Sequence, residues 1–299
     1  MSWQNWVLST GLKYRMKPLS KQGIDIAKVR AATAKPAVTT RVPAGWRIRP
    51  TREAPLLGEW IEPESEAEPG PTLLYLHGGG YVFCSPETHR PITVTLAARA
   101  PARVFSLDYR LAPEHPFPAA IEDAVAAYRQ LLAEGIPARR IVIGGDSAGG
   151  GLTLSTLLSL RAAGDELPAG AILFSPWTDL AGTGTTLVSN DKTDVMFHGE
   201  GLKSGGRHYL GATSPTDPLA SPLYADLGGL PPLFVQASGA EVLLADSTRL
   251  VEKARAAGVA VEFEIWPKLP HVWQIFAPFM PEARAALAKT SDFVREVTG

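Results

Sequence analysis

Hydrophobic residues fall along the chain in short runs that alternate with longer amphipathic stretches. The short runs predict strands at residues 46–49, 57–61, 72–76, 103–107, 141–143, 171–174, 233–237 and 260–266. The amphipathic spacing predicts helices at residues 3–32, 88–100 and 118–134, after the strand at 141–143, and in stretches ending near 257 and 297. This alternation indicates an α/β fold with a largely parallel sheet, helices on both faces and right-handed crossovers.

Two stretches depart from the alternation. Residues 180–215 are polar and irregular, so we expect an insertion between the sixth and seventh strands. The N-terminal helical stretch, residues 3–32, contains Pro18 and Gly23, which are predicted to break it into two pieces. No internal repeat interrupts the pattern. The pattern of the rest of the chain therefore predicts one continuous α/β unit.

Composition limits the class of protein. The 299 residues are 45% hydrophobic and 20% charged, enough for one large α/β domain or two small ones. No apolar run is long enough to span a membrane, and the first residues lack the pattern of a signal peptide. The single cysteine, Cys84, excludes an intrachain disulfide. We therefore expect a cytoplasmic protein without stable membrane insertion.

Charge is distributed unevenly although the formal net charge is only −1. Residues 1–52 hold eleven Lys or Arg and one acid, Asp25, whereas the remainder holds 18 basic and 29 acidic residues. Such a basic segment could bind anionic lipid, nucleic acid or an acidic part of its own fold. Because its basic residues are scattered among apolar ones, we favour the last interpretation and expect no nucleic-acid partner.

Residues 141–151 contain the first candidate reactive residue, Ser147. A buried strand is followed by Gly145, Ser147 and Gly149 in the pattern G-x-S-x-G, and then by an apolar helical run. A serine on so sharp a strand-to-helix turn has a strained backbone, and its neighbours two residues away approach too closely to carry side chains. Taken alone, the pattern also occurs as a glycine turn that caps a helix. The residues around the pattern therefore have to distinguish a nucleophilic serine from a capping turn.

The sequence His77-Gly-Gly-Gly follows the strand at 72–76. Consecutive glycines leave backbone N–H groups accessible, and beside a nucleophilic serine such a loop suits an oxyanion hole. The predicted donors are the N–H groups of Gly79, Gly80 and Ala148. We interpret His77 as a structural residue that ties the loop down through hydrogen bonds.

A nucleophilic serine needs a base and an orienting carboxylate. His271 follows the last strand and comes after Ser147 in the chain, which makes it the candidate base. Glu241 lies four residues beyond the strand at 233–237 and is the preferred acid, with Asp246 as the alternative. The chain order serine, acid, histidine is that of α/β-hydrolases.

Two other acids and the cysteine receive structural interpretations. Asp146 lies inside the serine motif but faces away from the nucleophile, and we expect it to brace the turn. Asp108 ends a strand in a polar, proline-bounded loop and is interpreted in the same way. Cys84, close to the glycine loop, is expected to be buried and inert.

Four motifs in order resemble the bacterial hormone-sensitive-lipase-like esterases. They are HGGG at 77–80, DYRLAPEHPFPAAIED at 108–123, GDSAGG at 145–150 and PHVW at 270–273. The resemblance implies an α/β-hydrolase fold with a mainly parallel eight-stranded sheet. It also implies a helical cap built from residues 1 to about 40 and about 180–215 on a single domain. Substrates would be carboxylic esters with short to medium acyl chains, and no metal or organic cofactor would be needed.

The chain departs from the family pattern at two positions. Members commonly carry aspartate where Glu241 stands, and often glycine where Cys84 stands. A glutamate is chemically competent as the orienting acid. The resemblance also raises a homodimer through the edge strand at 260–266, which nothing in the sequence itself requires.

The remaining expectations concern the substrate pocket and competing activities. Candidate lining residues, offered because they are aromatic or lie in the insertion, are Tyr81, Phe83, Trp177, Phe197 and His208. Amide or peptide hydrolysis by the same triad is one alternative. A ligand-binding receptor on the same fold is another, although the similar plant gibberellin receptors lack the histidine that this chain retains.

Overall fold

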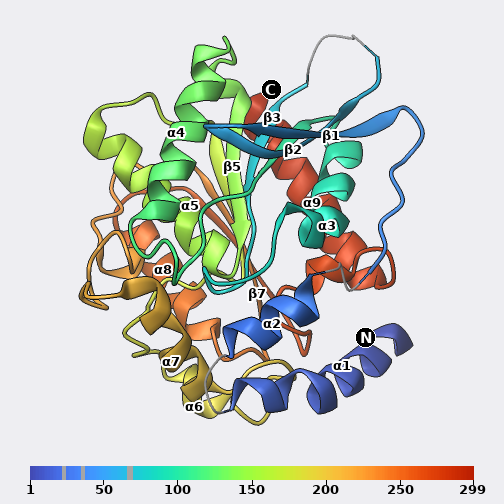
Figure 1. Ribbon diagram of the computed structural model, residues 1–299, viewed down its shortest axis with the longest axis vertical. Coiled ribbons are helices and arrows are strands. Elements are labelled where there is room, and N and C mark those ends of the chain that lie inside the picture. The colour runs from blue at the N-terminus through green and yellow to red at the C-terminus, as the bar shows by residue number, and fades with distance from the viewer. Residues whose placement is uncertain (22–24, 35–37, 66–69) are drawn as a thin grey trace.

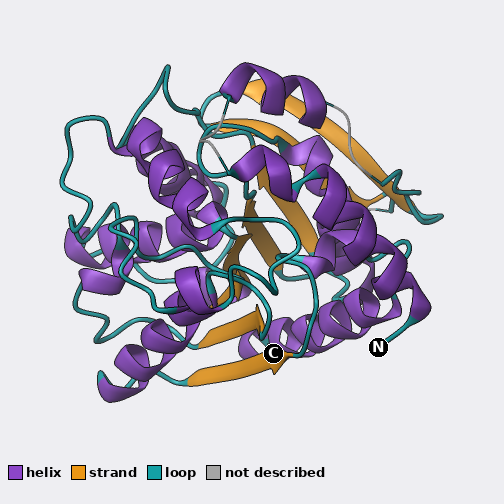
Figure 2. Cartoon of the chain, turned by 90° about the horizontal axis from the view of Figure 1, so that it is seen from below, coloured by secondary structure: helices purple, strands orange, loops and turns teal. Residues whose placement is uncertain are grey.

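The computed structural model of the protein describes residues 1–21, 25–34, 38–65 and 70–299. An eight-stranded sheet runs through the centre with helices packed on both of its faces (Figures 1 and 2). The strands are β1 Trp46–Glu53, β2 Leu56–Pro63, β3 Thr72–Leu76, β4 Arg103–Leu107, β5 Ile141–Asp146, β6 Gly170–Phe174, β7 Leu233–Ser238 and β8 Val261–Trp266. The helices are α1 Trp3–Arg15, α2 Ile26–Thr33, α3 Pro86–Arg99, α4 Ala119–Ala133, α5 Ala148–Ala163, α6 Thr186–Ser189, α7 Gly199–Leu210, α8 Leu244–Ala256 and α9 Pro281–Thr298. Short 3₁₀ turns are η1 Lys17–Ser20, η2 Ala138–Arg140, η3 Pro222–Tyr224 and η4 Trp273–Phe276.

The sheet has the strand order β1-β2-β4-β3-β5-β6-β7-β8. β1 and β2 pair antiparallel with each other, β2 pairs antiparallel with β4, and all other pairs are parallel. The predicted α/β-hydrolase sheet is thereby confirmed. β8 is the last strand on one side, so it is the edge strand on which the homodimer prediction rests; the dimer itself stays a prediction.

Continuous apolar runs explain the burial of the central strands. Every residue of β3, β5, β6 and β7 is buried, as expected for parallel strands covered on both faces. One core lies under α4, α5 and α8, with Tyr128, Leu157 and Leu250 among its members. The other lies under α3 and α9, with Leu96 and Phe293. This packing fixes the sheet as a rigid platform for the loops at its edge.

The N-terminal helices and the insertion lie together at one end of the molecule (α1, α2, α6 and α7 in Figure 1). The buried Lys17 ammonium joins them by donating to the main-chain carbonyl oxygens of Asp191 and, at 2.7 Å, Asp194. Ser20 Oγ accepts a hydrogen bond of 2.9 Å from the backbone N–H of His198. The two segments predicted as cap elements are therefore in direct contact.

The insertion contains a helix that the polar pattern of residues 180–215 did not predict. α7 has four glycines among its 12 residues, which lowers its intrinsic helix propensity. Close packing explains the glycines, because a Cβ at Gly201 would overlap the carbonyl oxygen of Ser20. The helical character implied by the family resemblance is present here. Of the two predicted breaks near the N-terminus, Pro18 lies in η1 and Gly23 lies outside the described residues.

Part of the basic N-terminal segment pairs with acids of the same chain. Arg47 and Arg49 both bond to the buried carboxylate of Glu62, with nitrogen–oxygen distances of 2.9 Å. Burial opposes that charge, but the arginines hold the pKa of Glu62 at about 2. Arg30 bonds to Glu114 at 2.7 Å. These pairs agree with the favoured interpretation of the charge pattern for residues 25–52.

Within the described part of the chain, no helix combines the length and apolar character needed to cross a membrane.

Candidate active site

Ser147 occupies the junction between β5, which ends at Asp146, and α5, which begins at Ala148. Its backbone has φ 53° and ψ −121°, a strained conformation for a residue with a side chain. Its N–H donates to Phe174 O at 2.8 Å. Its carbonyl accepts from the Trp177 N–H at 2.9 Å and from the N–H groups of Gly150 and Gly151. The turn keeps the Ser147 side chain partly exposed at the amino end of a helix.

The glycines on either side are required by close backbone approach. A Cβ at Gly149 would overlap the carbonyl oxygen of Leu76, and a Cβ at Gly145 would overlap the same oxygen. Because these neighbours are backbone atoms of the rigid sheet, they cannot move aside as a flexible side chain would. The spacing of the G-x-S-x-G pattern therefore follows from packing against the end of β3.

We expect Gly149→Ala to destabilise the protein by about 3 kcal/mol, because the added methyl group forces the elbow away from β3. Gly11→Ala is the matched control: a Cβ added at Gly11, in α1, would meet no atom within 4 Å, and the substitution should change stability by less than about 1 kcal/mol. Urea unfolding of both variants measures the difference. Equal stabilities would contradict the packing argument.

The glycine loop follows β3 directly. Gly79 has φ 111° and Gly80 has φ 60°, conformations that favour glycine. Within the described residues, neither of their N–H groups has a protein acceptor. Ala148 is the first residue of α5, where N–H groups lack an intrahelical partner. All three predicted oxyanion donors therefore lie at the ends of β3 and β5, which are adjacent strands.

Asp146 ties the glycine loop to the serine turn. Its Oδ1 accepts from the Tyr75 hydroxyl at 2.7 Å and from the Gly78 N–H at 3.1 Å, and its Oδ2 lies 3.2 Å from His89 Nε2. Burial opposes ionisation, but the charge and hydrogen bonds of these partners hold the pKa of Asp146 below its ordinary value. Asp146 has the bracing geometry expected for it.

His77 is buried in the loop and stacks on the Tyr109 ring with 4.3 Å between centroids. Burial, with the neighbouring His89 charge, lowers the pKa of His77 to about 3, so the ring is neutral at pH 7. His77 Nδ1 lies 2.7 Å from the Gly78 carbonyl oxygen. The Tyr109 hydroxyl donates to the main-chain carbonyl oxygen of His77 at 2.7 Å. These contacts match the expected structural role.

Glu241 and His271 meet beyond the ends of β7 and β8. His271 Nδ1 lies 2.6 Å from Glu241 Oε2, and both side chains are buried. The other carboxylate oxygen of Glu241 accepts from the Ser238 N–H at 3.0 Å, which fixes its orientation. His271 Nε2 is buried and has no hydrogen-bond partner among the described residues. His271 Nδ1 is thus held by the Glu241 carboxylate, and Nε2 is left available to accept a proton.

Charges around His271 favour its protonated form. Burial opposes the imidazolium, but the hydrogen bond and charge of Glu241, together with the charges of Asp194 and Asp146, raise the pKa of His271 above its ordinary value. Such an environment stabilises the cation that forms when the ring accepts a proton.

The alternative acid, Asp246, points elsewhere. Its Oδ2 accepts from the N–H groups of Thr178 and Asp179, both at 2.9 Å, in the loop after β6. Burial raises the pKa of Asp246 to about 7, despite these bonds and the nearby Arg249. The structure therefore pairs His271 with Glu241 and gives Asp246 a bracing position.

The insertion is hydrogen-bonded to residues 239–242, the loop after β7 that carries Glu241 and is here called the acid loop. This contact was not predicted from the sequence. Asp194 is buried; its Oδ2 accepts from the Val242 N–H at 2.9 Å, and its Oδ1 accepts from the N–H groups of Met196 and Phe197. Nearby insertion side chains bond the same loop: Asn190 to the carbonyls of Gly239 and Glu241, Thr193 to Ala240, and Thr186 to Val242. The run of polar residues at 186–194 is the only sequence signal for this contact.

We expect Asp194→Asn to lower kcat about 10- to 100-fold, because an amide group facing the Val242 N–H displaces the acid loop. Loss of the negative charge also lowers the pKa of His271. Since only the neutral imidazole accepts a proton, the acid limb of the kcat/KM profile should move to lower pH. Rate measurements on a soluble ester between pH 5 and 9 test both effects.

Asp191→Asn provides the control for this substitution. Asp191 lies in the same segment but bonds to the His198 ring and the Gly199 N–H instead of the acid loop. Its pH profile should match that of the unmodified protein. An unshifted profile in Asp194→Asn would show that Asp194 serves only to hold the segment together.

A cavity of about 810 Å³ opens beside these residues. Three of the predicted pocket residues line it, Phe83, Phe197 and His208. The Phe197 ring, which lines the cavity, packs edge-on against the His271 imidazole with 5.2 Å between centroids, so one side chain links the cavity to the candidate base. Ser147, Glu241 and His271 do not themselves line the cavity. The other lining residues come mainly from the N-terminal segment: Met16, Pro18, Leu19, Ser20, Asp25, Lys28, Val29, Ala32, Thr33, Cys84, Thr88, Met196, Ser204 and Ile275.

Tyr81 and Trp177 lie in the core instead of on the cavity wall. Tyr81 has φ 64°, which turns its ring inward to stack on Tyr209 with 3.7 Å between centroids. Trp177 is buried near the same stack. Cys84 does reach the cavity lining, where burial raises the pKa of its thiol to about 12 and keeps it protonated. Cys84 is thus half-buried instead of buried as predicted, and its inertness stays a prediction that a protonated thiol favours.

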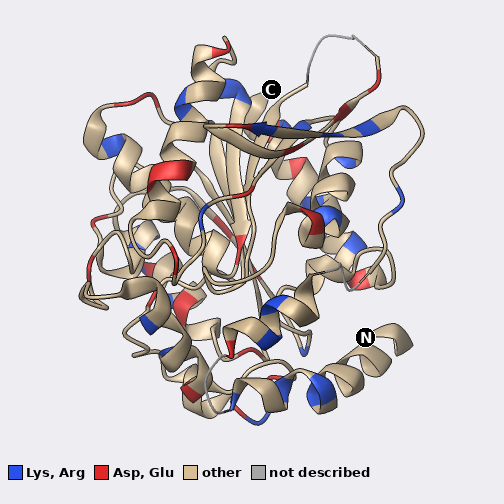
Figure 3. Cartoon of the chain, in the orientation of Figure 1, with Lys and Arg blue, Asp and Glu red and all other residues tan. Residues whose placement is uncertain are grey.

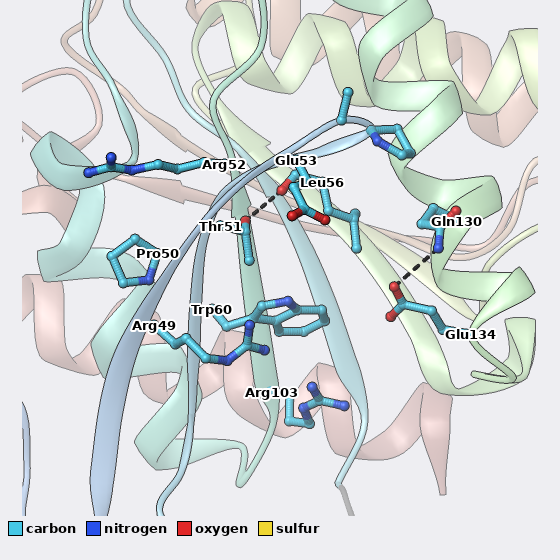
Figure 4. A pocket seen from close by; sticks show the side chains of 12 residues that line it. Arg49, Pro50, Thr51, Arg52, Glu53, Leu56, Trp60, Arg103, Gln130 and Glu134 are labelled. Carbon is cyan, nitrogen blue, oxygen red and sulfur yellow. Dashed lines mark hydrogen bonds between the residues drawn. The ribbon is translucent and has the colours of Figure 1, made fainter.

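A second cavity, of about 610 Å³, lies under the β1–β2 hairpin (Figure 4). Arg103 stacks over the Trp60 ring there, 4.3 Å from its centroid, and Gln130 bonds to Glu134. None of the residues predicted for catalysis lines this cavity. It also shares no lining residue with the 810 Å³ cavity, whose Phe197 contacts the His271 ring, and it is therefore separate from the candidate active site.

The order of the strands in the sheet, the serine turn and the loops at the strand ends together define an α/β-hydrolase. Residues 73–275 match the family described as having the alpha/beta hydrolase fold, and the chain belongs to that family. An acetyl-hydrolase of Streptomyces hygroscopicus is 46% identical over 241 residues, which cover 81% of this chain and 80% of the relative.

Two solved structures are closely similar to the chain. An esterase of the bacterial hormone-sensitive lipase family is 44% identical, with a TM-score of 0.82 and coverage of 92% of this chain and 97% of that one. EstE5, in a crystal soaked with p-nitrophenyl butyrate, is 38% identical, with a TM-score of 0.92 and coverage of 100% and 99%. The protein is a carboxylic ester hydrolase whose structural neighbours are esterases of the hormone-sensitive lipase family.

Proposed function

We propose that Ser147, His271 and Glu241 act as nucleophile, base and orienting acid in carboxylic ester hydrolysis. The observation that supports this most directly is the buried 2.6 Å contact between Glu241 and His271, which leaves His271 Nε2 unpartnered among the described residues. The strands β5, β6, β7 and β8 are consecutive in the sheet, so the loops that carry the three residues share its carboxyl edge.

In the acylation step, Ser147 Oγ attacks the ester carbonyl carbon while His271 Nε2 takes the hydroxyl proton. Glu241 holds the Nδ1–H tautomer and stabilises the imidazolium. The N–H groups of Gly79, Gly80 and Ala148 stabilise the oxyanion of the tetrahedral intermediate. The imidazolium then protonates the departing alkoxide oxygen, which leaves an acyl group on Ser147.

Deacylation repeats the same steps with water. His271 removes a proton from a water molecule that attacks the acyl carbon, and the oxyanion donors again stabilise the intermediate. The imidazolium returns the proton to Ser147 Oγ, and the carboxylic acid is released. The elevated pKa of His271 suits both proton transfers, because a base that binds its proton too weakly could not accept one from serine.

We also propose that the substrates carry short to medium acyl chains. η1, α2 and α7, which belong to the proposed cap, contribute lining residues to the 810 Å³ cavity, whose wall is largely apolar. Phe83 and Phe197 lie on the wall of that cavity, and Phe197 also packs against the His271 ring. The relative named an acetyl-hydrolase and the butyrate ester used on EstE5 both have short acyl groups, which supports this range.

A series of p-nitrophenyl esters with acyl chains of two to sixteen carbons tests the proposal. We expect kcat/KM to peak between about two and eight carbons and to fall at greater length. Matched p-nitroanilides should react far more slowly, because an amide has a poorer leaving group. A maximum at the longest chains would overturn the size assignment, and equal rates on amides would overturn the ester preference.

A further inference from the structure

The outer face of α1 exposes an unusual number of aromatic side chains. Trp3, Trp6 and Tyr14 are 67%, 71% and 74% exposed, and Val7 on the same face is 45% exposed. Six of the eleven large hydrophobic side chains exposed in the described part of the chain fall within residues 1–19. Exposed apolar groups concentrated in this way mark interaction surfaces.

The opposite face of α1 already accounts for the attachment of the helix. Leu8 and Leu12 pack against the core under α3 and α9, and Asn5 is buried and donates to the Lys268 carbonyl at 3.2 Å. On the outer face, Trp3 packs edge-on against Phe279, which is itself 38% exposed. Trp3 therefore adds to the attachment of α1 through Phe279, whereas Trp6, Val7 and Tyr14 are left largely to solvent.

Charge on residues 1–21 is entirely positive. Residues 1–21 contain four basic residues and no acid, whereas residues 53–299 contain 18 basic and 29 acidic residues. Lys13 and Arg15 are exposed in the last turn of α1, and neither has an ion-pair partner among the described residues. Figure 3 shows basic residues on α1 and α2 at the end of the molecule where the cap lies.

The outer face leads directly to the proposed substrate cavity. α1 runs into Met16 and η1, where Met16, Pro18 and Leu19 line the cavity. Leu19 is also 54% exposed, so an apolar side chain stands at the cavity edge. A surface in contact with the outer face of α1 would therefore lie next to the cavity.

We propose that the outer face of α1, made of Trp3, Trp6, Val7 and Tyr14 with Lys13 and Arg15, docks onto lipid surfaces that carry anionic headgroups. Indole and phenol rings have an apolar body and a polar tip and settle at the level of lipid headgroups. Basic residues beside them bind the negative surface. Docking brings esters dispersed in the lipid to the cavity edge; this last step rests on the proposed function.

A second copy of the chain fits this face less well. If two copies paired through their outer faces with parallel helices, Lys13 and Arg15 of each would face those of the other, and like charges repel. An antiparallel pair would leave these basic residues without an acidic partner on the facing helix, since residues 1–21 hold no acid. A single 13-residue helix also offers little area for a stable dimer. An anionic lipid surface satisfies the aromatic and the basic side chains together.

Sedimentation with vesicles tests the proposal on the full-length protein. Vesicles of phosphatidylcholine with 30% phosphatidylglycerol should bind the protein, and vesicles of pure phosphatidylcholine should bind it less. The triple variant Trp3→Ser, Trp6→Ser, Tyr14→Ser should bind the mixed vesicles at least about tenfold more weakly. Val188→Ser removes a 77% exposed apolar residue from α6 and is the matched control, which should bind normally.

The double variant Lys13→Glu, Arg15→Glu should lose most binding to the mixed vesicles, as should the unmodified protein at high salt. All variants should hydrolyse a soluble butyrate ester at the normal rate, because none of these residues touches the catalytic groups. Normal hydrolysis without vesicle binding overturns the docking proposal and leaves the proposed function intact. Absence of hydrolysis in the unmodified protein overturns the proposed function instead. A concentration-dependent dimer that disappears in the triple variant, measured by light scattering, would assign the face to a second copy.

Discussion

Replacing Ser147 with alanine is expected to lower kcat for p-nitrophenyl butyrate by roughly 10⁴-fold or more. The substitution removes the oxygen that forms the acyl-enzyme, while the oxyanion donors and the cavity remain. What activity persists should come from water attacking a bound ester. Alanine should occupy the same backbone conformation, since the φ of 53° is imposed by the bonds to Phe174 and Trp177.

Ser175→Ala is the matched control for this result. Ser175 also follows a strand, is buried, and has a positive φ of 46°. Among the described residues its hydroxyl makes only one hydrogen bond, which it accepts from the Val272 N–H at 3.5 Å. Its loss should reduce kcat less than about tenfold. The thermal midpoints of both variants should stay near that of the unmodified protein. Retention of normal turnover by Ser147→Ala, with normal folding, would exclude Ser147 as the nucleophile.

The sheet was predictable because its signals are local. Continuous apolar runs marked β3, β4 and β6 to within one residue, and their flanking glycines and prolines marked the turns. β1 extends to Glu53 although apolar alternation stops near Arg49, because its pairing with β2 does not depend on burial. Backbone hydrogen bonding of an exposed hairpin leaves little trace in hydrophobic pattern.

The candidate site likewise has parts that local sequence signals predict and parts that depend on contacts between distant segments. The serine turn, the glycine loop, the acid and the base each follow a recognisable strand, so their positions could be inferred from order along the chain. Asp194 could not, because its role depends on a bond to Val242 across 48 positions of sequence. Tyr81 illustrates a different limit: a positive φ turns it into the core, and sequence does not reveal which way a loop residue faces.

Replacing Glu241 with glutamine is expected to lower kcat by about 10³- to 10⁴-fold with little change in KM. Glutamine keeps the size of the side chain, and its oxygen can still accept from the Ser238 N–H. Its amide group would then face His271 Nδ1 and donate to it. The ring proton would be forced onto Nε2, the nitrogen that must receive the proton of Ser147, so the wrong tautomer would predominate.

Glu241→Asp and Asp246→Asn separate this explanation from loss of structure. Aspartate restores the charge on a shorter side chain, so it should recover part of the rate that glutamine loses. Asp246→Asn disturbs the bonds to the Thr178 and Asp179 N–H groups and should lower stability more than kcat. Steady-state kinetics with urea unfolding measures both quantities for each variant. If Asp246→Asn instead abolished turnover in a stably folded protein while Glu241→Gln did not, the orienting acid would be Asp246, and His271 would have to turn away from Glu241 during the reaction.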